Sequence, residues 1–215
     1  MGTIRKMRFS YVRLYTALLL LSCSLALTGC GKEEKKVSDS SLDGSFRWSS
    51  FPVNVRIDDS LLDRGAAEDD LNEAIRFWER RAGRILFNRS GWRSGVAPYT
   101  GDPSDPASLL DNVIYFQSPW PHEPRVAGKT ILFAQSGIIQ NAAIFLNANT
   151  DLCSGLCIDE ATRTSRRKLL AHELGHFLGL PHVNERNNVM YPEILPGGDL
   201  RSLRVDIQTL KRLVN

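Results

Sequence analysis

The fold of this chain is best predicted from one stretch, His172-Glu173-Leu174-Gly175-His176-Phe177-Leu178-Gly179-Leu180-Pro181-His182. It places three histidines, a glutamate and a glycine in the pattern H-E-x-x-H-x-x-G-x-x-H. Residues four apart share one face of a helix, so His172 and His176 can direct two imidazoles to one point. Gly179 lets the backbone leave the helix in a conformation that other residues resist, and this turn brings His182 back to the same point.

Three imidazoles that meet at one point indicate a metal site. Zinc with three protein ligands keeps an open position, as catalytic sites do, whereas structural zinc sites are usually closed by four ligands. Glu173 projects beside the ligands, where it can take a proton from a water. HExxH alone also arises by chance in helices, and the added Gly179 and His182 make the pattern specific. We therefore predict one catalytic Zn²⁺ bound by His172, His176 and His182, with Glu173 as the general base.

A second feature is the run Asn188-Val189-Met190-Tyr191-Pro192, in which Met190 follows His182 by eight residues. Together with the histidines, this run resembles the metzincin superfamily of zinc endopeptidases and is most similar to its matrixin branch. In that family the methionine turn packs beneath the zinc ligands, which agrees with reading Met190 as an ordinary core residue. The resemblance also assigns Pro192 to the outer wall of the S1' pocket, which takes the substrate residue after the cut.

The first 29 residues have the features of an export signal. The start carries four basic residues and no acid, and an apolar run at 17–27 follows. That run is too short to span a membrane as a stable helix. It ends in Leu27-Thr28-Gly29-Cys30, which resembles the lipobox of bacterial lipoproteins, where cleavage precedes a lipidated cysteine. The alternative is an ordinary secretory signal that ends in a chance cysteine.

The lipoprotein interpretation divides the chain into three parts. Residues 1–29 are the signal peptide, residues 30–50 are the lipidated Cys30 and a polar, flexible tether, and residues 51–215 form one domain. Lipid on Cys30 would anchor the protein to a membrane without a spanning helix. By resemblance to Gram-negative lipoproteins, Gly31 favours the outer membrane. The expected location is therefore the bacterial cell envelope.

The net charge of the chain depends on its signal. The whole chain has 27 basic and 24 acidic residues, and four of the basic ones lie in residues 1–29. The remainder has 23 basic against 24 acidic residues. This balance gives no support to a nucleic-acid partner.

Two cysteines, Cys153 and Cys157, lie just before the histidine pattern. Outside the cytoplasm, two cysteines at this spacing are expected to form a disulfide. The alternative is a pair of metal ligands, which would need further partners. His122 is the only histidine outside the zinc pattern, so a second Cys/His zinc site is hard to build.

Apolar patterning predicts the order strand, helix, strands, helix, turn, helix. The expected strands are 51–57, 84–88, 112–117, 130–135 and 138–147, with a long loop at 89–110. The zinc helix should begin within 161–167 and end at residue 177 or 178, and a last helix should span about 204–214. This order resembles the matrixin catalytic domain. The expected fold class is α+β, with a twisted mixed sheet of about five strands and three helices.

In matrixins the fourth strand is an antiparallel edge that pairs with the substrate. The matching residues here are Thr130, Ile131, Leu132, Phe133, Ala134 and Gln135. A peptide added to such an edge would be held by main-chain hydrogen bonds, largely regardless of its sequence. An interior strand is the alternative interpretation of the same residues.

One regulatory feature common in the family has no match, and a calcium site is possible. Matrixins often carry a propeptide with a Pro-Arg-Cys-Gly run whose cysteine caps the zinc, and this run does not occur here. Asp102, Asp105 and Asp111 are candidate ligands for Ca²⁺, but they suit a solvated loop equally well.

The function predicted from these observations is a zinc-dependent metalloendopeptidase that hydrolyses peptide bonds in proteins at the bacterial cell envelope. One alternative is an envelope protein that binds zinc without turnover. The intact Glu173 argues against it, because a structural zinc site needs no general base. The other alternative is a hydrolase of cell-wall peptide stems, since the same metal chemistry serves both substrates.

Overall fold

The computed structural model describes residues 34–38, 42–96, 111–155, 157 and 163–215. The predicted signal peptide, Cys30, and the calcium candidates Asp102 and Asp105 lie outside the described residues. Asp111 is described, and its carboxylate lies 3.6 Å from the guanidinium of Arg56. Within the described ranges, the helices lack the length and apolar character needed to cross a membrane.

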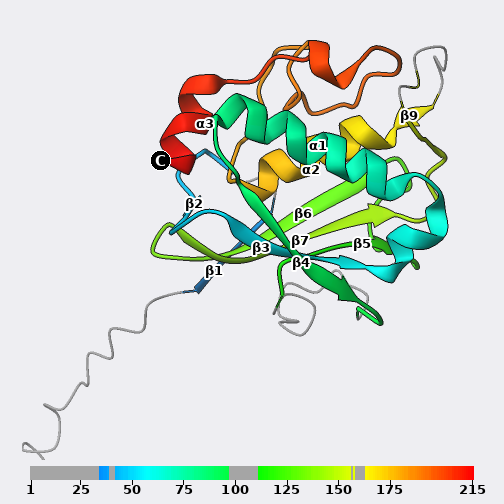
Figure 1. The fold of residues 1–215 in the computed structure, drawn as a ribbon, viewed down its shortest axis with the longest axis horizontal. Coiled ribbons are helices and arrows are strands. Elements are labelled where there is room, and N and C mark those ends of the chain that lie inside the picture. Colours follow the sequence, from blue (N-terminus) through cyan, green and yellow to red (C-terminus); the bar gives the residue numbers. More distant parts are fainter. Residues whose placement is uncertain (1–33, 39–41, 97–110, 156, 158–162) are drawn as a thin grey trace, which may run out of the picture. The chain divides into compact units, whose positions relative to one another are not determined.

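A mixed sheet of seven strands forms one layer, and α1 and α2 lie over one of its faces (Figure 1). The strand order is β1-β6-β7-β5-β3-β4, and β2 also pairs with β7. All pairings are parallel except those of β6, which is antiparallel to both β7 and β1. The strands are β1 (Glu34–Ser38), β2 (Arg47–Trp48), β3 (Val53–Asp58), β4 (Phe87–Arg93), β5 (Val113–Gln117), β6 (Gly128–Gln135) and β7 (Ile138–Asn147).

Three α-helices complete the domain, α1 (Ala67–Ala82), α2 (Arg166–Phe177) and α3 (Ile207–Val214). In the described ranges, the 3₁₀ helices η2 (Asp59–Arg64) and η3 (Leu200–Ser202) lie before α1 and before α3. A small parallel sheet, β8 (Leu152–Cys153) with β9 (Thr164–Ser165), leads into α2. The mixed sheet and three helices confirm the predicted α+β class.

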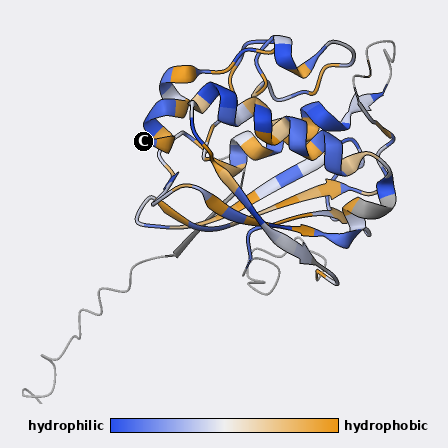
Figure 2. Ribbon diagram, viewed as in Figure 1, coloured by the Kyte–Doolittle hydropathy of each residue, from blue (hydrophilic) through white to orange (hydrophobic). Residues whose placement is uncertain are grey.

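The main core lies between the sheet and α1 and α2. In β3, Val53, Val55 and Ile57 alternate with exposed residues, as expected for a strand with one covered face. Leu71 and Trp78 lie on the apolar stripe of α1 and are fully buried. Figure 2 shows this alternation of apolar and polar residues around α1.

The folded domain begins earlier than residue 51. Leu42, Phe46 and Trp48 are buried in the main core, and β2 pairs with β7. The indole of Trp48 donates a hydrogen bond to the carbonyl oxygen of Phe177 at the end of α2, at 2.7 Å. The tether predicted for residues 30–50 is therefore too long. The sequence did not reveal this, because three apolar residues among polar neighbours form no periodic pattern.

The strand expected to bind substrate, β6, has a neighbour on each side. One side pairs with β7, and the other pairs with β1, from the predicted tether. Glu34 lies opposite Gln135 and Ser38 lies opposite Ile131. Within the part of the chain described from residue 42 onward, β6 is the last strand of the sheet on this side.

Candidate metal centre

Helix α2 carries the histidine pattern, and all its residues except Arg167 are buried. Its N-cap is Ser165, whose hydroxyl accepts a hydrogen bond from the amide of Lys168. Arg166 and Arg167, in the first turn, form ion pairs with the fully buried Asp70 of α1, at 3.0 and 3.2 Å. These pairs fix α2 against α1, and so they fix the position of the side chains that follow.

The imidazoles of His172, His176 and His182 meet at one point, as predicted. Their Nε2 atoms lie 3.1 Å (His172 to His176), 3.0 Å (His176 to His182) and 3.2 Å (His182 to His172) apart. Helical spacing aligns the first two rings. Gly179, at φ +96°, turns the backbone so that His182 supplies the third.

The hydrogen bonds of two rings show which nitrogen faces this point. Nδ1 of His172 lies 2.8 Å from the carbonyl oxygen of Val189, and Nδ1 of His176 lies 2.8 Å from that of Leu180. A carbonyl accepts, so each Nδ1 carries the proton and each Nε2 presents a lone pair. Lone pairs about 3 Å apart repel unless a cation lies between them. Tetrahedral zinc, with Zn–N near 2.0–2.1 Å, brings ligand nitrogens to about 3.3 Å, so these residues fit zinc.

Burial has a strong electrostatic effect on His176, whose ring is fully buried. Desolvation holds the pKa of this imidazole well below its usual value, and the neighbouring His172 and His182 lower it further. His176 is therefore neutral near pH 7, which is the form that binds a metal.

In the metal-free protein, this shift is expected to make stability fall on acidification. An unfolded histidine titrates near pH 6.5, whereas folded His176 titrates lower. Below about pH 6.5 the unfolded chain binds a proton that the folded chain does not, which costs up to about 1.4 kcal/mol for each pH unit from this group. Urea unfolding of the chelated protein between about pH 8 and pH 5 measures the change. Unfolding free energy that stays constant or rises on acidification would contradict it.

Glu173 lies beside the histidines and is held from the opposite side by β6. The residue is buried, with 3% of its surface exposed. Thr130 donates a hydrogen bond from its hydroxyl to Oε2 of Glu173, at 2.6 Å. The other carboxylate oxygen, Oε1, faces Gly128, where an added Cβ would lie only 2.8 Å away. The sequence assigned Thr130 to the edge strand, but it did not predict this contact with the expected base.

Met190 lies beneath the zinc helix, as the resemblance implied. Its side chain packs so closely on Gly175 that a Cβ added there would overlap the Met190 sulfur. The same Cβ would lie 2.7 Å from the ring of Trp78. Trp78 in turn donates an indole hydrogen bond to the carbonyl oxygen of Ala171, at 2.7 Å. The helix between the first two histidines is thus packed from below by the methionine and from α1 by the tryptophan.

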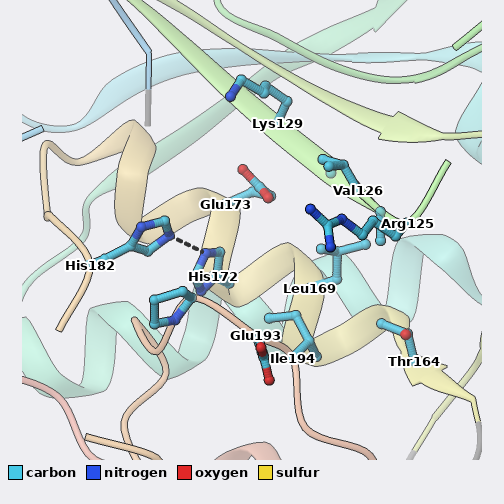
Figure 3. A pocket seen from close by; sticks show the side chains of 13 residues that line it. Arg125, Val126, Lys129, Thr164, Leu169, His172, Glu173, His182, Glu193 and Ile194 are labelled. Carbon is cyan, nitrogen blue, oxygen red and sulfur yellow. Dashed lines mark hydrogen bonds between the residues drawn. The ribbon is translucent and has the colours of Figure 1, made fainter. Parts of the chain in front are cut away.

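A cleft of about 560 Å³ opens in front of the histidines (Figure 3). The start of β6 and the segment before it form one wall, α2 forms the floor, and the segment after the methionine forms the other wall. Pro192 lines this second wall with Glu193 and Ile194. The residues that line the cleft are Arg125, Val126, Ala127, Gly128, Lys129, Thr164, Leu169, His172, Glu173, His182, Pro192, Glu193 and Ile194.

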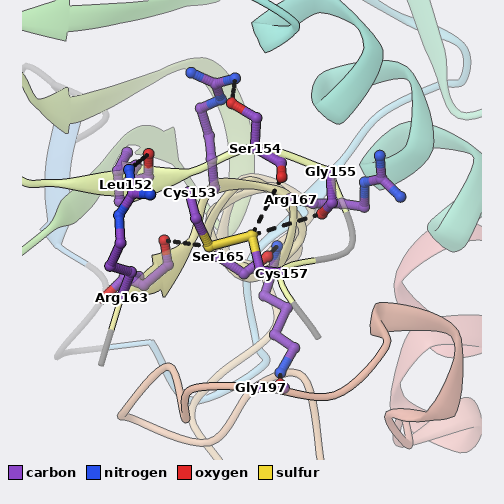
Figure 4. Close-up of a disulfide and its surroundings, with 12 residues drawn as sticks. Leu152, Cys153, Ser154, Gly155, Cys157, Arg163, Ser165, Arg167 and Gly197 are labelled. Atoms are coloured by element: carbon purple, nitrogen blue, oxygen red, sulfur yellow. Dashed lines mark hydrogen bonds between the residues drawn. A yellow bond between two sulfur atoms is a disulfide. The ribbon is translucent and has the colours of Figure 1, made fainter. Parts of the chain in front are cut away.

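The sulfurs of Cys153 and Cys157 are bonded to each other beside the start of α2 (Figure 4). Cys153 belongs to β8 and lies opposite Ser165 of β9. Because Ser165 is also the N-cap of α2, the disulfide stabilises the segment that starts the zinc helix.

Reducing this disulfide is expected to lower the stability of the fold by about 2 kcal/mol, the chain-entropy value for so short a loop. Urea unfolding with and without reductant measures the change. The double variant Cys153→Ser, Cys157→Ser is the control, and reductant should not alter it. Equal midpoints for the oxidised and reduced wild-type chain would contradict the expected contribution.

Comparison with known proteins identifies the family of this chain. A search of curated proteins found no match to this chain. The family model for matrixin, a group of peptidases, matches residues 47–213. The match covers most of the chain and includes the three histidines and Glu173. Because the matched domain places these histidines where they can hold one metal ion, the chain belongs to the matrixin family and is a zinc metalloendopeptidase.

Proposed function

We propose that this enzyme is anchored by lipid on Cys30 to the bacterial cell envelope, at the outer membrane, and that it cuts extended segments of proteins there. The cleft in front of the histidines supports the substrate class, and the run Leu27-Thr28-Gly29-Cys30 supports the anchor. One wall of the cleft is the start of β6, and the outer edge of this strand, which pairs with β1 in the structure, could instead hold a substrate by main-chain hydrogen bonds. A site of this kind accepts many sequences, provided that the segment is unfolded or flexible.

The proposed substrate lies antiparallel to β6. β6 begins at Gly128, beside Glu173, and its residue numbers rise away from the metal site. A peptide antiparallel to it places the residues before the cut along 131–135. The residues after the cut then leave past Pro192 and Ile194.

Each residue of the site then has a defined task in peptide hydrolysis. His172, His176 and His182 would hold zinc, which, when bound, acidifies a water and polarises the substrate carbonyl. Glu173 accepts the proton of the attacking water and passes it to the leaving amine. The carbonyls of Val189 and Leu180 keep two of the rings in the tautomer that the site needs.

The substrate class is tested by comparing an unstructured protein with cell-wall material. The zinc-loaded enzyme is expected to cleave casein at several internal bonds, read by mass spectrometry, and to leave peptidoglycan fragments intact. Cleavage of the fragments alone would instead support a cell-wall hydrolase. Zinc binding without cleavage of either would favour a binding protein.

The location is tested in cells that express the full chain. The wild-type protein is expected in the membrane fraction, with an N-terminal peptide that begins at a lipidated Cys30. Cys30→Ser should lose this lipid and leave the membrane fraction. A wild-type chain that is recovered without lipid would overturn the proposed anchor.

A further inference from the structure

We infer that Thr130 is the positioning residue for Glu173, which deepens the proposed hydrolysis and rests on it. Thr130 is fully buried, and its side chain faces α2. Its hydroxyl lies 2.6 Å from Oε2 of Glu173 and 3.1 Å from the backbone oxygen of the same residue. The hydroxyl has one proton, which it donates chiefly to the nearer Oε2, and the backbone oxygen of the same residue lies on its other side. The hydrogen bond therefore ties the Glu173 carboxylate to β6.

This contact gives the two oxygens of the Glu173 carboxylate different roles. Oε2 accepts the Thr130 hydrogen bond, and Oε1 lies on the side of Gly128, which lines the cleft together with Glu173. We assign to Oε1 the proton of the attacking water. A short hydrogen bond to a charged oxygen is among the stronger ones in proteins. It also comes from a strand rather than from a loop, so the orientation is set by the sheet itself.

Gly128 supplies the space that this orientation needs. A Cβ at this position would lie 2.8 Å from Oε1 of Glu173 and 3.1 Å from Cδ1 of Leu169. A methyl group there would push the carboxylate away from its place. Gly128 and Thr130 are two residues apart on one strand and so project to the same face. Together they position the Glu173 carboxylate: Thr130 donates a hydrogen bond to it, and Gly128 leaves the space that it occupies.

The test is a set of substitutions at residue 130 in the full zinc-loaded chain. Thr130→Val keeps the shape and removes the hydroxyl, and it is expected to lower kcat for a peptide substrate by about 10- to 100-fold while KM stays within a factor of two. Thr130→Ser restores the hydroxyl and should recover most of kcat. Gly128→Ala should lower kcat in the same way as Thr130→Val.

A second readout separates this proposal from the proposed function. Crystal structures of wild type and Thr130→Val should show the Glu173 carboxylate in different positions, whether or not a substrate is known. If wild-type protein with zinc cleaves nothing, the proposed function fails, and these structures still test whether Thr130 positions Glu173. A Glu173 carboxylate in the same position in both structures, or equal kcat for wild type and Thr130→Val, would overturn the positioning role of Thr130.

A different observation supports a second inference. We propose that the segment Glu34–Ser38, which is β1, competes with substrate for the edge of β6. It pairs with residues 131–135, which are the residues expected to hold the substrate before the cut. It also runs antiparallel to β6, in the direction proposed for the substrate. Its last residue, Ser38, lies opposite Ile131, one position from Thr130.

Such a segment raises the apparent KM without touching the reacting groups. Substrate can pair with residues 131–135 only in molecules whose β1 has left the edge. The apparent affinity for substrate is therefore reduced in proportion to the fraction of such molecules. The segment is part of the same chain, so its effective concentration at the edge is high. β1 would thus restrain the enzyme in a chain that lacks the Pro-Arg-Cys-Gly run.

Lys36→Pro tests this idea, because proline cannot donate to a strand ladder. The control is Lys36→Ala, which leaves the backbone unchanged. For a peptide with four or more residues before the cut, Lys36→Pro is expected to lower KM by about 3- to 10-fold with kcat unchanged. For a blocked peptide with one residue before the cut, the two variants should be equal. Equal KM values for the long peptide would overturn the competition.

Amide hydrogen exchange tests the pairing of β1 with β6 without any need for peptide hydrolysis. The outward-facing amides of residues 131–135 should exchange more slowly in Lys36→Ala than in Lys36→Pro, with no substrate present. If neither variant cleaves peptides, only the proposed function fails. Equal exchange in the two variants would show that β1 does not cover the edge.

Discussion

Replacing Glu173 with glutamine is expected to lower kcat for peptide hydrolysis by about 10²- to 10⁴-fold, which is the contribution of a positioned general base. The amide of glutamine has nearly the same shape as the carboxylate, but it cannot accept the proton of the attacking water. The Thr130 hydroxyl can still donate to the glutamine oxygen, so the side chain should stay in place. Steady-state kinetics on an unstructured peptide measures the loss.

Zinc content is the control for this variant. His172, His176 and His182 are unchanged in Glu173→Gln, so the variant should bind one zinc per chain and unfold at the same urea concentration as wild type. A variant that keeps both zinc and more than a tenth of wild-type kcat would show that another group accepts the proton.

The second large effect is expected from Gly179→Ala. Gly179 has φ +96°, and a Cβ there would overlap the backbone oxygen of Phe46. Phe46 is buried and immediately precedes β2, and its backbone oxygen cannot move aside as a flexible side chain can. Left-handed strain costs about 1–2 kcal/mol, and overpacking adds about 1–3 kcal/mol. The variant should also bind zinc more weakly, because Gly179 directs the chain toward His182.

Gly83→Ala is the matched control. Gly83 also has a left-handed φ, of +70°, at the end of α1, but an added Cβ meets nothing within 4 Å. This control should lose only the strain energy and keep its zinc affinity. Urea unfolding of both metal-free variants compares the two costs. Equal losses of unfolding free energy would show that the contact with Phe46 does not matter.

The metal site was predictable because it depends on local spacing. His172 and His176 are one helical turn apart, and Gly179 and His182 follow within the same stretch, so a helix and one turn determine their geometry. The α+β fold was predictable from the apolar patterns and the family resemblance. The pattern around residues 84–88 did predict a strand, but β4 begins at Phe87 and continues to Arg93. The second half of this strand is mostly polar, so its sequence shows no apolar pattern that predicts a strand.

The remaining features depend on contacts between distant parts of the chain. Thr130 and Glu173 are 43 residues apart, and nothing in the local sequence of either indicates their hydrogen bond. Trp48 contacts the end of α2 across 129 residues, and its polar neighbours led to the prediction of a tether. β1 is rich in charge and short, so only its pairing with β6 identifies it as a strand.

Zinc-dependent cleavage by the wild-type chain tests the central claim most directly. Purified protein is stripped of metal, reloaded with measured amounts of zinc, and assayed on casein at each step. Activity is expected to be absent in the stripped protein and to rise in proportion to zinc until one ion per chain is bound. Casein cleavage at full rate by the stripped protein, or a folded chain that takes up no zinc, would contradict the assignment.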